Sequence, residues 1–558
     1  MTEKRKRTRK SDQQTPMLKP CQVPDQINRR RFFRGAAMLT IGGLGATAGL
    51  AQRNESRGSA TNTEPVDASE QLEAQTQRAQ RWANRDPANW ARSRAGVDHN
   101  VVIVGGGQSG TAIAYGLKRK GVGHVEVIDQ AEPDQAGIWR TIARMHQLRT
   151  PKILAGLEQD NPMLSFRAWY ETLNGPGAFD SLDRIPRLAW ADYTDWFQRV
   201  TGIPVRYRTR LLEIEPQGDL LRLHLESEGV RRVETTRKLV LANGYAGAGG
   251  PNVPDFLRTL PSDVWTHTVS PISFDALTGK VVGIVGAGSS AFDAAAVALE
   301  SGAAEVHMFN RRAYVDYPRP RSSAPTDRGH PNVREMTYEL PDAVRWRNFL
   351  LRDRRVASVP LDSIERVTSF EGFRLHLESS LSDVAFADGM VVGRVAGEAW
   401  RFDHVIAATG YRIDLSAQPE LANVYDSIAL WRDRYRPETG EDNAAGSIHP
   451  YLGAGFQFLP QEATGASYLR NIHCFNLSGI LSFGKPIGDI PSAADHPRLV
   501  SAIARDLYLE SVDTAAHQRF INSPLAAPDP TPYQEVIQQR AHEAAKRFRH
   551  RNGVVLTA

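Results

Sequence analysis

Two apolar runs of strand length, each followed by a glycine-containing turn and a helical segment, organise the middle of the chain. The first stretch, VVIVGGGQSGTAIAYGLKRKGVGHVEVIDQ from Val101, predicts a buried strand, a helix and a second buried strand that ends at Asp129. The second stretch, KVVGIVGAGSSAFDAAAVALESGAAEVHMFNRR from Lys280, repeats this plan and ends its last strand at Phe309. Strands that alternate with helices in this way predict parallel sheets in an α/β fold.

The first turn carries three glycines in the spacing G-x-G-x-x-G: Gly105, Gly107 and Gly110. These glycines permit a tight turn, close approach of backbone to a pyrophosphate and close packing of helix on strand. We expect Gln108 and Ser109, at the start of the helix, to lie at the phosphates, where free N–H groups favour negative charge. Asp129 is placed to accept hydrogen bonds from ribose hydroxyls. A dinucleotide site is predicted over the alternative of a glycine turn without a ligand.

The second turn has Gly286 and Gly288, with alanine in the third position and Ser289 and Ser290 opening the helix. Its last strand is followed by Asn310 and then by two arginines, Arg311 and Arg312. An acid at that strand end would repel a 2′-phosphate, whereas arginine pairs with it through charge-assisted bonds. This favours NADPH over NADH. The alternative is that one or both arginines face solvent at an ordinary strand end.

Two similar strands flank the second unit. FDHVIAATGYRIDL, from Phe402, ends in a turn with Thr409 and Gly410, and KLVLANGYAG, from Lys238, is a looser copy. Either one alone reads as a buried strand and a turn, in which glycine lets the backbone pass close to a cofactor. Together they predict two Rossmann-like domains of the three-layer ββα type, with the NADP domain inserted in the FAD domain.

The expected domain limits follow from these motifs. The FAD domain is predicted at 98–275 and 401–558, the second part with a C-terminal helix, and the NAD(P) domain at 276–400. Residues 52–97 are polar and predict a linker with one outer helix. The segment 534–550 predicts an amphipathic surface helix, and an oligomer is possible.

Charge and cysteine content remove several classes of function. Residues 1–34 carry eleven Lys or Arg against three Asp or Glu, so of the formal net charge of +5 the other residues contribute about −3. The basic composition therefore predicts no nucleic-acid surface. The chain has two cysteines, Cys21 and Cys474, far apart in sequence. This excludes a dithiol reductase, a cysteine-based metal site and a disulfide scaffold, and we expect no structural metal.

The amino-terminal region, 1–51, resembles a twin-arginine export signal. Arg29-Arg30-Arg31-Phe32-Phe33 precedes an uncharged run, residues 35–51, rich in Gly and Ala. Those 17 residues are short for a bilayer span of about 20, so no stable membrane span after processing is expected. Export to the periplasm or cell envelope is predicted. A disordered basic tail, an uncleaved anchor and a cytoplasmic protein remain alternatives, and NADPH is scarce outside the cytoplasm.

With these motifs in place, the chain resembles the flavin-containing monooxygenase superfamily from about Asn100 to about Val500. Trp139 ends the element Gly137-Ile138-Trp139, which corresponds to the family's G-G-x-W, with Ala136 replacing its first glycine. GAGSSAFD matches the family's NADP-binding run, and Asp403 with AATGY matches its D-x5-A-T-G-Y pattern. The resemblance implies that NADPH reduces FAD, that the flavin takes O2 to a C4a-hydroperoxide sheltered by NADP+, and that one oxygen atom enters a small-molecule substrate.

The subclass stays open. The Baeyer–Villiger fingerprint F-x-G-x3-H-x3-W/Y is absent from LPSDVWTHTVSPISF, where Pro261, Asp263 and Pro271 replace its aromatic and glycine positions around His267. A contact of His267 with the nicotinamide and a structural role both remain open. The resemblance places the segment after the FAD ribose acid near the isoalloxazine, so Arg149, Thr150 and Lys152 are candidates to touch flavin or nicotinamide.

Gly488 and Asp489 resemble the last FAD contact of such flavoproteins; a helix cap by Asp489 is the alternative. Arg149 and Lys152 have a comparable alternative, in which they cap a helix end or face water. For the whole chain, an NADPH-driven flavin reductase or oxidase and a non-catalytic nucleotide-binding protein stay open beside the monooxygenase. The substrate cleft is expected among the segments 155–190, 320–350 and 440–475, which carry no signature.

Overall fold

The computed structural model describes residues 68–82, 87–154, 156–317, 336–354, 358–462 and 464–552. All of them belong to one compact unit, Pro65–Ala558. The predicted signal region, 1–51, and Cys21 lie outside the described residues.

The first sheet has six strands, in the order β2-β1-β5-β4-β3 with β14 also paired to β5. Its strands are β1 (His99–Val104), β2 (Val125–Ile128), β3 (Thr209–Gln217), β4 (Leu220–Ser227), β5 (Val230–Leu241) and β14 (Ile472–Cys474). β1 runs parallel to β2 and to β5, as the buried runs predicted, while β3, β4 and β5 form an antiparallel meander. β14 comes from far along the chain and runs parallel to β5.

The second sheet has five strands, all parallel, in the order β6-β13-β7-β8-β9. They are β6 (Trp265–His267), β7 (Val281–Val285), β8 (Glu305–Phe309), β9 (Phe373–His376) and β13 (His404–Ala407). A separate antiparallel sheet consists of β10 (Ser382–Ala387), β11 (Met390–Val395) and β12 (Glu398–Phe402). The chain leaves the first sheet after β5 and returns to it at β14. The part that holds the second sheet is therefore inserted, and we call it the inserted unit, whereas the part that holds the first sheet is the first unit.

Sheet membership extends the inserted unit beyond the limits expected from the motifs. β6 precedes residue 276 and β13 follows residue 400, yet both pair within the second sheet. The predicted boundaries followed the glycine motif and the start of the exit strand. They missed β6 because a strand of three residues has too little periodicity to be recognised in sequence.

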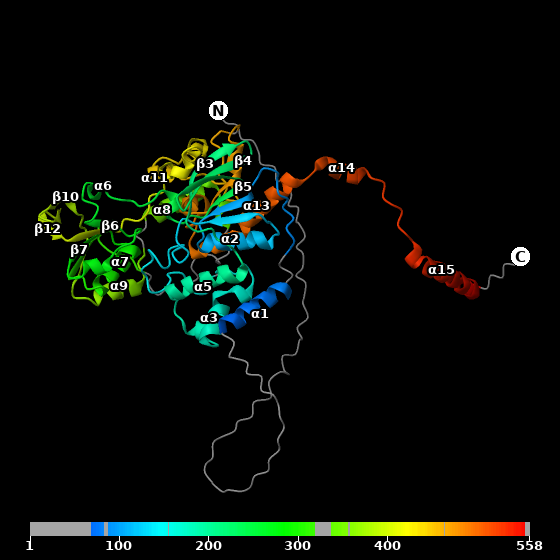
Figure 1. Cartoon of the computed structure of the whole chain (residues 1–558), viewed down its shortest axis with the longest axis horizontal. Helices are drawn as coiled ribbons and strands as arrows, with labels where there is room; N and C mark the ends of the chain where they lie inside the picture. The colour runs from blue at the N-terminus through cyan, green and yellow to red at the C-terminus, as the bar shows by residue number, and fades with distance from the viewer. Residues whose placement is uncertain are drawn as a thin grey trace, which may run out of the picture. The chain divides into compact units, whose positions relative to one another are not determined.

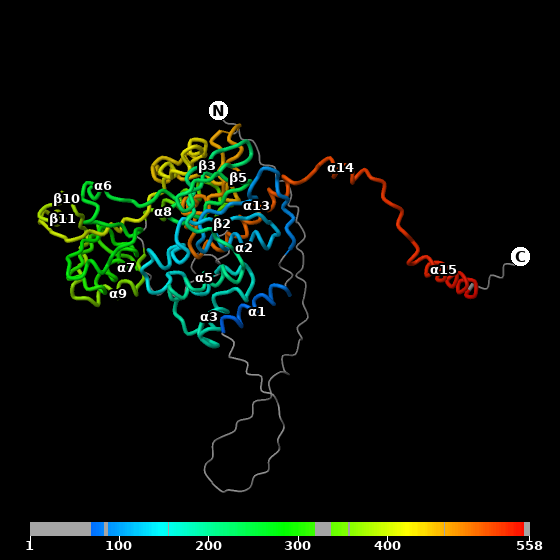
Figure 2. The backbone as a smooth tube through the Cα atoms, viewed as in Figure 1, coloured from blue at the N-terminus to red at the C-terminus, as the bar shows by residue number. Residues whose placement is uncertain are grey.

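The helices of the first unit come from the two parts of the chain that flank the inserted unit. They are α1 (Ala68–Trp82), α2 (Gln108–Arg119), α3 (Phe166–Asn174), α4 (Ala178–Ser181), α5 (Arg187–Thr201), α10 (Trp431–Arg434), α11 (Ala444–Ser447), α12 (Ile480–Phe483) and α13 (His496–Ser511). α2 packs against α13 and α5, and α1 packs against α3 (Figures 1 and 2). α1 is the helix expected within 52–97.

Helix α5 shows why these segments fold as they do. Its buried residues Trp190, Tyr193, Trp196, Phe197 and Val200 recur at helical spacing, so one face enters the core. The helix ends at Gly202, which has the left-handed conformation typical of a helix C-terminus, with φ 62°. Phe197 meets Tyr115 of α2 edge to face, with ring centroids 5.5 Å apart.

The remaining helices are α6 (Asp255–Arg258), α7 (Ser289–Glu300), α8 (Asp342–Arg354), α9 (Leu361–Thr368), α14 (Thr514–Asn522) and α15 (Thr531–Asn552). α7 connects β7 to β8, and α9 lies beside α7 (Figure 1). α15 corresponds to the helix predicted at 534–550. The residues of α14 and α15 whose exposure is described are solvent-exposed, apart from one intermediate position in α14. Among the described helices, none combines the length and apolar character needed to cross a bilayer.

Two short connecting segments join the inserted unit to the first sheet and run side by side. Asn252 N–H donates to Gly410 O at 2.9 Å, and Arg412 N–H donates to Gly250 O at 2.9 Å. Pro251 forms a β-bridge with Tyr411. The segments after the two exit strands are therefore hydrogen-bonded to each other at the point where the chain changes units.

Candidate functional site

The first glycine turn follows β1 and is closed by backbone contacts that only glycine permits. Gly105 has φ 111°, and a Cβ there would lie 2.4 Å from the carbonyl oxygen of Ala242, at the end of β5. A Cβ at Gly110 would lie 1.8 Å from Gly105 O. The G-x-G-x-x-G spacing is thus explained by the close packing of the turn between α2 and β5, the exit strand.

The amino terminus of α2 has the features of a pyrophosphate site. Its N-cap is Gly107, which offers no side-chain cap to the first N–H groups of the helix. Ser109 Oγ is buried and has no hydrogen-bond partner among the described residues. Free N–H groups and a donor hydroxyl at a helix N-terminus suit a phosphate. These observations fit the pyrophosphate of FAD.

Asp129 lies at the end of β2, beside the same turn. Gly106 N–H donates to its Oδ2 at 2.7 Å, and Ala131 N–H donates to its Oδ1 at 2.8 Å. The carboxylate is held at the strand end by these two bonds and keeps further lone pairs for ribose hydroxyls. This placement leaves Asp129 available to a ribose, and its ribose-binding role stays a prediction.

Gln108 connects four distant segments of the chain. Its Oε1 accepts hydrogen bonds from Trp139 Nε1 at 3.2 Å and from Trp190 Nε1 at 3.0 Å, and its Nε2 donates to Gly488 O at 3.2 Å. Three of the predicted site residues, Gln108, Trp139 and Gly488, are therefore brought together. Trp190 of α5 completes the group and was missed, because nothing local in the sequence marks its partner.

Asp489 opens the 3₁₀ helix η10 (Ile490–Asp495) as its N-cap, and its side chain accepts from Ser492 N–H at 3.0 Å. Gly488 has φ 94° and donates its N–H to Ser492 Oγ at 2.9 Å. Burial raises the pKa of Asp489 to about 6. The cap that the sequence offered as an alternative is present, at a position next to the FAD turn through Gly488.

The second glycine turn repeats the geometry of the first. Gly286 has φ 112°, and a Cβ there would lie 2.5 Å from Ala408 O, just after β13. Gly288 is the N-cap of α7 and again provides no side-chain cap. Ser289 Oγ donates to Ser358 O at 3.2 Å, and Ser290 is exposed. The turn fits the pyrophosphate of a second dinucleotide, with Ser290 on its open side.

The end of β8 carries no acid. Asn310 Oδ1 accepts from Arg312 N–H at 3.2 Å, and Asn310 Nδ2 donates to Tyr314 O at 3.0 Å. Arg311 and Arg312 are both exposed. The guanidinium of Arg312 donates only weakly, at 3.4 Å, to Arg354 O. Both arginines therefore lie exposed just after β8, at the position where the sequence predicts binding of a 2′-phosphate.

Thr409 and Gly410 lie in the connecting segment after β13. Thr409 Oγ1 donates to Asn252 O and lies 3.4 Å from His267 Nε2, while Gly410 O accepts from Asn252 N–H. His267 is buried and its Nδ1 accepts from Val269 N–H at 3.2 Å. Burial, with the Arg144 cation nearby, lowers the pKa of His267 to about 4. His267 is thus a neutral, hydrogen-bonded residue of the connection.

The two proposed catalytic cations have protein partners. Lys152 Nζ donates to the carbonyl oxygens of Phe179 and Asp180, at 2.8 and 2.9 Å, and to that of Leu182, at the end of α4. Arg149 pairs with Asp293 of α7. Lys152 therefore caps the end of α4 and Arg149 bridges the two units, while a contact of either residue with flavin or nicotinamide stays a prediction. A sequence segment shows neither contact, because both partners are distant in the chain.

Two tyrosines that the sequence analysis did not single out end the two exit motifs. Tyr245 and Tyr411 meet edge to face, with ring centroids 5.3 Å apart. Burial raises the pKa of Tyr411 to about 12 and that of Tyr245 further. Arg149 and Arg352 are close enough to oppose the shift of Tyr245, and Asp489 adds to it. Residues of both units therefore meet at the tyrosine pair. Asp489, beside the FAD turn, and two cations, Arg149 and Arg352, lie close to Tyr245.

Lys485 adds a third cation near this point. Its Nζ lies 2.7 Å from Asp495 Oδ2, and both side chains are buried. Lys485 and Arg352 are near enough to Asp489 to lower its pKa, although burial prevails. Arg352 also donates to Gly484 O, the residue before Lys485. Three cations, Arg149, Arg352 and Lys485, thus lie in this region together with three carboxylates, Asp293, Asp489 and Asp495.

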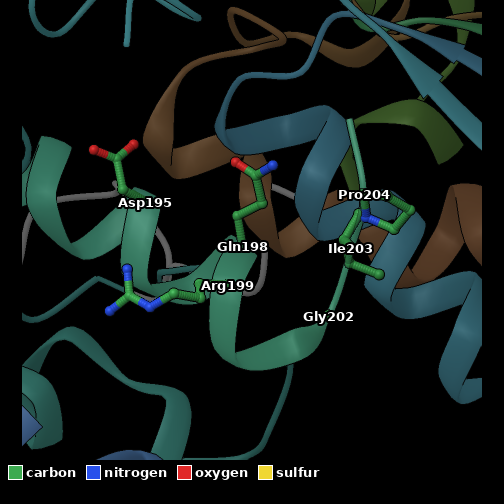
Figure 3. A pocket seen from close by; sticks show the side chains of 6 residues that line it. All are labelled: Asp195, Gln198, Arg199, Gly202, Ile203 and Pro204. Carbon is green, nitrogen blue, oxygen red and sulfur yellow. The ribbon is translucent and has the colours of Figure 1, made fainter. Parts of the chain in front are cut away.

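The segment after α5 forms the outer edge of the first turn. A Cβ at Gly106 would lie 2.6 Å from Val205 Cγ1, and Tyr207 OH donates to Gln198 Oε1 at 3.0 Å. An open surface pocket lies here, and Figure 3 shows its lining residues on α5 and just beyond it: Asp195, Gln198, Arg199, Gly202, Ile203 and Pro204. Because Val205 directly follows the lining residue Pro204, the pocket lies close to the first glycine turn.

Few side chains of the described residues could take part in thiol or metal chemistry. Cys474 is buried in β14, and burial raises the pKa of its thiol to about 12. Over the described residues, no three His, Cys, Asp or Glu side chains gather in a group that could hold a metal ion.

Comparison with known proteins gives matches over most of the described chain. A family model described as FAD-NAD(P)-binding matches residues 102–246, and one described as L-lysine 6-monooxygenase/L-ornithine 5-monooxygenase matches residues 179–367. The FAD-dependent urate hydroxylase of Xanthomonas campestris pv. campestris is 38% identical over 428 residues, which are 75% of this chain and 89% of that protein.

Solved structures share the fold at lower identity. An ornithine hydroxylase from Pseudomonas aeruginosa has a TM-score of 0.58 and 21% identity, with 74% of this chain and 99% of that chain covered. The L-lysine 6-monooxygenase from Pseudomonas syringae has a TM-score of 0.56 and 18% identity, with 74% and 100% covered. These two likenesses show the common arrangement of the sheets.

Proposed function

Because the chain belongs to the family of FAD-dependent monooxygenases that includes the Xanthomonas urate hydroxylase, we propose that it hydroxylates an anionic heterocycle of the urate type. The chain is an FAD-dependent, NADPH-using monooxygenase, as the resemblance implied. The reductase, oxidase and non-catalytic alternatives are therefore set aside. FAD, when bound, supplies the transfer of electrons from NADPH to O2.

The observation that carries the substrate proposal is the identity of 38% across 89% of the urate hydroxylase. Two cations also lie near the tyrosine pair. Arg149 and Arg352 are close to Tyr245, and the carboxylates of this region, Asp293, Asp489 and Asp495, are buried and paired or capping. Urate is an anion at neutral pH, so a guanidinium beside the tyrosine pair attracts it and orients its planar ring.

The tyrosine pair contributes in a second way. Tyr245 and Tyr411 keep their phenol protons at neutral pH, because an ordinary phenol has a pKa near 10 and burial raises both pKa values further. A neutral phenol donates one hydrogen bond and presents an aromatic face. Both properties suit a flat heterocycle with carbonyl oxygens, which stacks on a ring and accepts hydrogen bonds.

N-hydroxylation of lysine or ornithine is the second candidate, because the family model of that description matches residues 179–367. Those substrates bring a side-chain amine, which must lose its positive charge before it reacts as a nucleophile. We rank the purine-type anion first, because the identity of 38% extends over 89% of the urate hydroxylase, whereas the lysine/ornithine family model matches residues 179–367 alone.

The test is substrate-dependent NADPH oxidation with urate, xanthine, L-lysine and L-ornithine, with peroxide measured beside it. We expect urate to stimulate NADPH consumption with little peroxide and to gain one 18O atom from 18O2. Stimulation and hydroxylamine formation only with lysine or ornithine would replace the proposed substrate. Equal peroxide release with all four compounds would remove the proposal that any of them is hydroxylated.

We also propose that residues 1–51 direct export by the twin-arginine route, on the basis of the paired arginines and the uncharged run that follows. This route carries folded proteins, which suits a protein that loads FAD inside the cell. Changing Arg29→Lys together with Arg30→Lys should keep the protein in the cytoplasmic fraction. Unchanged distribution between the fractions would contradict export.

A further inference from the structure

One loop of the first unit is joined to the inserted unit at three points. The loop, residues 142–149, follows Trp139 of the FAD site. Arg144 donates from its guanidinium to Thr268 O at 2.6 Å and to Ser270 O at 2.9 Å, just before the second glycine motif. Arg366 of α9 donates to Arg144 O at 3.3 Å. Arg149 makes the third connection, to Asp293.

Asp293 is the acceptor at the centre of these contacts. It lies in α7, five residues after Gly288, and only 2% of its surface is exposed. Its Oδ2 pairs with Arg149, and its Oδ1 accepts from Ser363 Oγ of α9 at 2.9 Å. Arg366 Nη1 stands 4.0 Å from the same Oδ1. A carboxylate this deeply buried depends on such partners, and removing one leaves an uncompensated charge.

The surroundings of Asp293 are strongly cationic. Burial lowers the pKa of Arg144 to about 10, and the charge of Asp293 opposes this shift. Burial also lowers the pKa of Arg187, as do the charges of Arg140 and Arg366, and Asp293 again opposes the change. One carboxylate of the NADP helix therefore compensates several cations of the FAD-side loop and its neighbours, so its position is set by both units.

The location of the pair gives it a consequence for chemistry. α7 begins at the turn that fits the pyrophosphate of NADPH, and the 142–149 loop leads out of the FAD turn. A salt bridge between α7 and this loop fixes the distance between the two glycine turns. Hydride transfer requires the reacting atoms about 3–3.5 Å apart, and a misplacement of about 1 Å costs roughly a hundredfold in rate.

We propose that Arg149 and Asp293 are positioning residues for reduction of the flavin by NADPH. The pair, supported by Ser363, holds α7 against the FAD-side loop so that the nicotinamide meets the flavin at reacting distance. In that step a hydride passes from the nicotinamide to FAD, so NADPH is oxidised to NADP+ and FAD takes up the two electrons together with the proton of the hydride. The inference rests on the proposed function, and it gives Arg149 a role through Asp293 that does not require a direct flavin contact.

The experiment compares Asp293→Asn, Arg149→Gln and the double variant, each purified with FAD bound. Flavin reduction by NADPH is followed anaerobically in a stopped-flow instrument, and reoxidation by O2 is followed after reduction with dithionite. We expect the rate constant for reduction by NADPH to fall about tenfold to a hundredfold in each single variant. The double variant should fall no further, because both changes break the same pair. Reoxidation and FAD content should stay within twofold of the wild type.

Arg140→Gln is the matched control. Arg140 is on the same part of the chain but pairs within the first unit, with Asp192 at 2.7 Å and Asp195 at 2.6 Å. It loses the same charge without touching α7, so reduction by NADPH should keep the wild-type rate. Arg149→Lys, which keeps the charge, and Ser363→Ala, which removes one hydrogen bond, should give intermediate rates and serve if Asp293→Asn does not fold.

The outcomes separate the two proposals. Wild-type reduction rates in the Arg149 and Asp293 variants overturn the positioning role. Equal losses in NADPH reduction, O2 reoxidation and FAD content overturn it as well, because they show a general loss of structure. If FAD in the wild-type enzyme is not reduced by NADPH at all, the proposed function fails first and the positioning role fails with it.

Discussion

The two glycine turns of this protein share one backbone design and differ in what surrounds it. Gly105 and Gly286 both have positive φ, 111° and 112°, and both stand against the carbonyl that follows an exit strand, Ala242 O or Ala408 O. Ala242 N–H and Ala408 N–H return hydrogen bonds to the strands before the turns, at 2.9 and 2.8 Å. The cradle for a pyrophosphate is therefore built twice from the same backbone contacts.

The surroundings of the first turn enclose it. Gln108 ties it to Trp139, to Trp190 of α5 and to Gly488, and Ser109 Oγ is buried without a partner among the described residues. At the second turn, Ser290 is exposed and the cations after β8 face solvent. An enclosed turn suits a prosthetic group that stays bound, and an open one suits a coenzyme that exchanges in each cycle. The difference lies in distant segments rather than in the glycine motifs.

The largest effect is expected from filling the two turns. Gly105→Val should give nearly colourless protein, because its Cβ would meet Ala242 O and the positive φ is strained in a branched residue. Gly286→Val should keep its FAD but lose reduction by NADPH by roughly a hundredfold or more. Flavin absorbance per protein and anaerobic reduction measure the two. Loss of FAD from both variants alike would contradict the assignment of the first turn to FAD and the second to NADPH.

Gln108→Leu tests the enclosure of the first turn. It leaves the buried Trp190 N–H without its acceptor, which costs about 1–3 kcal/mol, and it releases Gly488. We expect the dissociation constant of FAD to rise about tenfold and the melting temperature to fall by several degrees. Ser289→Ala, at the corresponding place in the second turn, loses one hydrogen bond to Ser358 O and should change stability by less than about 0.5 kcal/mol.

The strand ends sharpen the comparison further. Arg311→Ala and Arg312→Ala should raise KM for NADPH about tenfold and leave KM for NADH nearly unchanged, since a charge-assisted bond to the 2′-phosphate is lost. Steady-state kinetics with both coenzymes measure this difference. Equal changes for NADPH and NADH would show that neither arginine reads the phosphate.

A modest pH dependence is expected at the connection. The pKa of His267 is about 4 in the folded chain and near 6.5 when unfolded, so the unfolded state binds the proton first as pH falls. The contribution of His267 to the free energy of unfolding is fully present above about pH 6.5 and is lost progressively as the pH falls to about 4. From pH 6.5 to 5.5 the loss should be about 1 kcal/mol, measured as wild type minus His267→Gln in denaturant unfolding. A difference that does not vary with pH would show that His267 titrates normally.

Asp489, beside the first turn, should respond in the opposite direction. Its pKa of about 6 lies above the unfolded value, so the folded state holds the proton longer and stability falls as pH rises from about 4 to 6. The same unfolding measurement with Asp489→Asn should show the opposite slope. Slopes of one sign for both residues would contradict one of the two burial arguments.

The sequence by itself determined the parts that depend on local backbone requirements. Glycine spacing, apolar strands and the acid at Asp129 predicted both βαβ units and the insertion, because a tight turn and a buried strand each leave a mark within a few residues. The absence of an acid at Asn310 likewise favoured NADPH. The C-terminal helix and the Asp489 cap were also predictable from short-range patterns.

Only the tertiary structure decided what the longer side chains do. Lys152 caps α4, Arg149 pairs with Asp293, and Lys485 reaches Asp495, although none of these contacts is encoded in the spacing of neighbouring residues. Gln108 likewise acquires its role from Trp190 and Gly488, which are far from it in sequence. A motif specifies a backbone shape, but a flexible cation takes the acceptor that folding brings to it, and that choice depends on the packing of the whole chain.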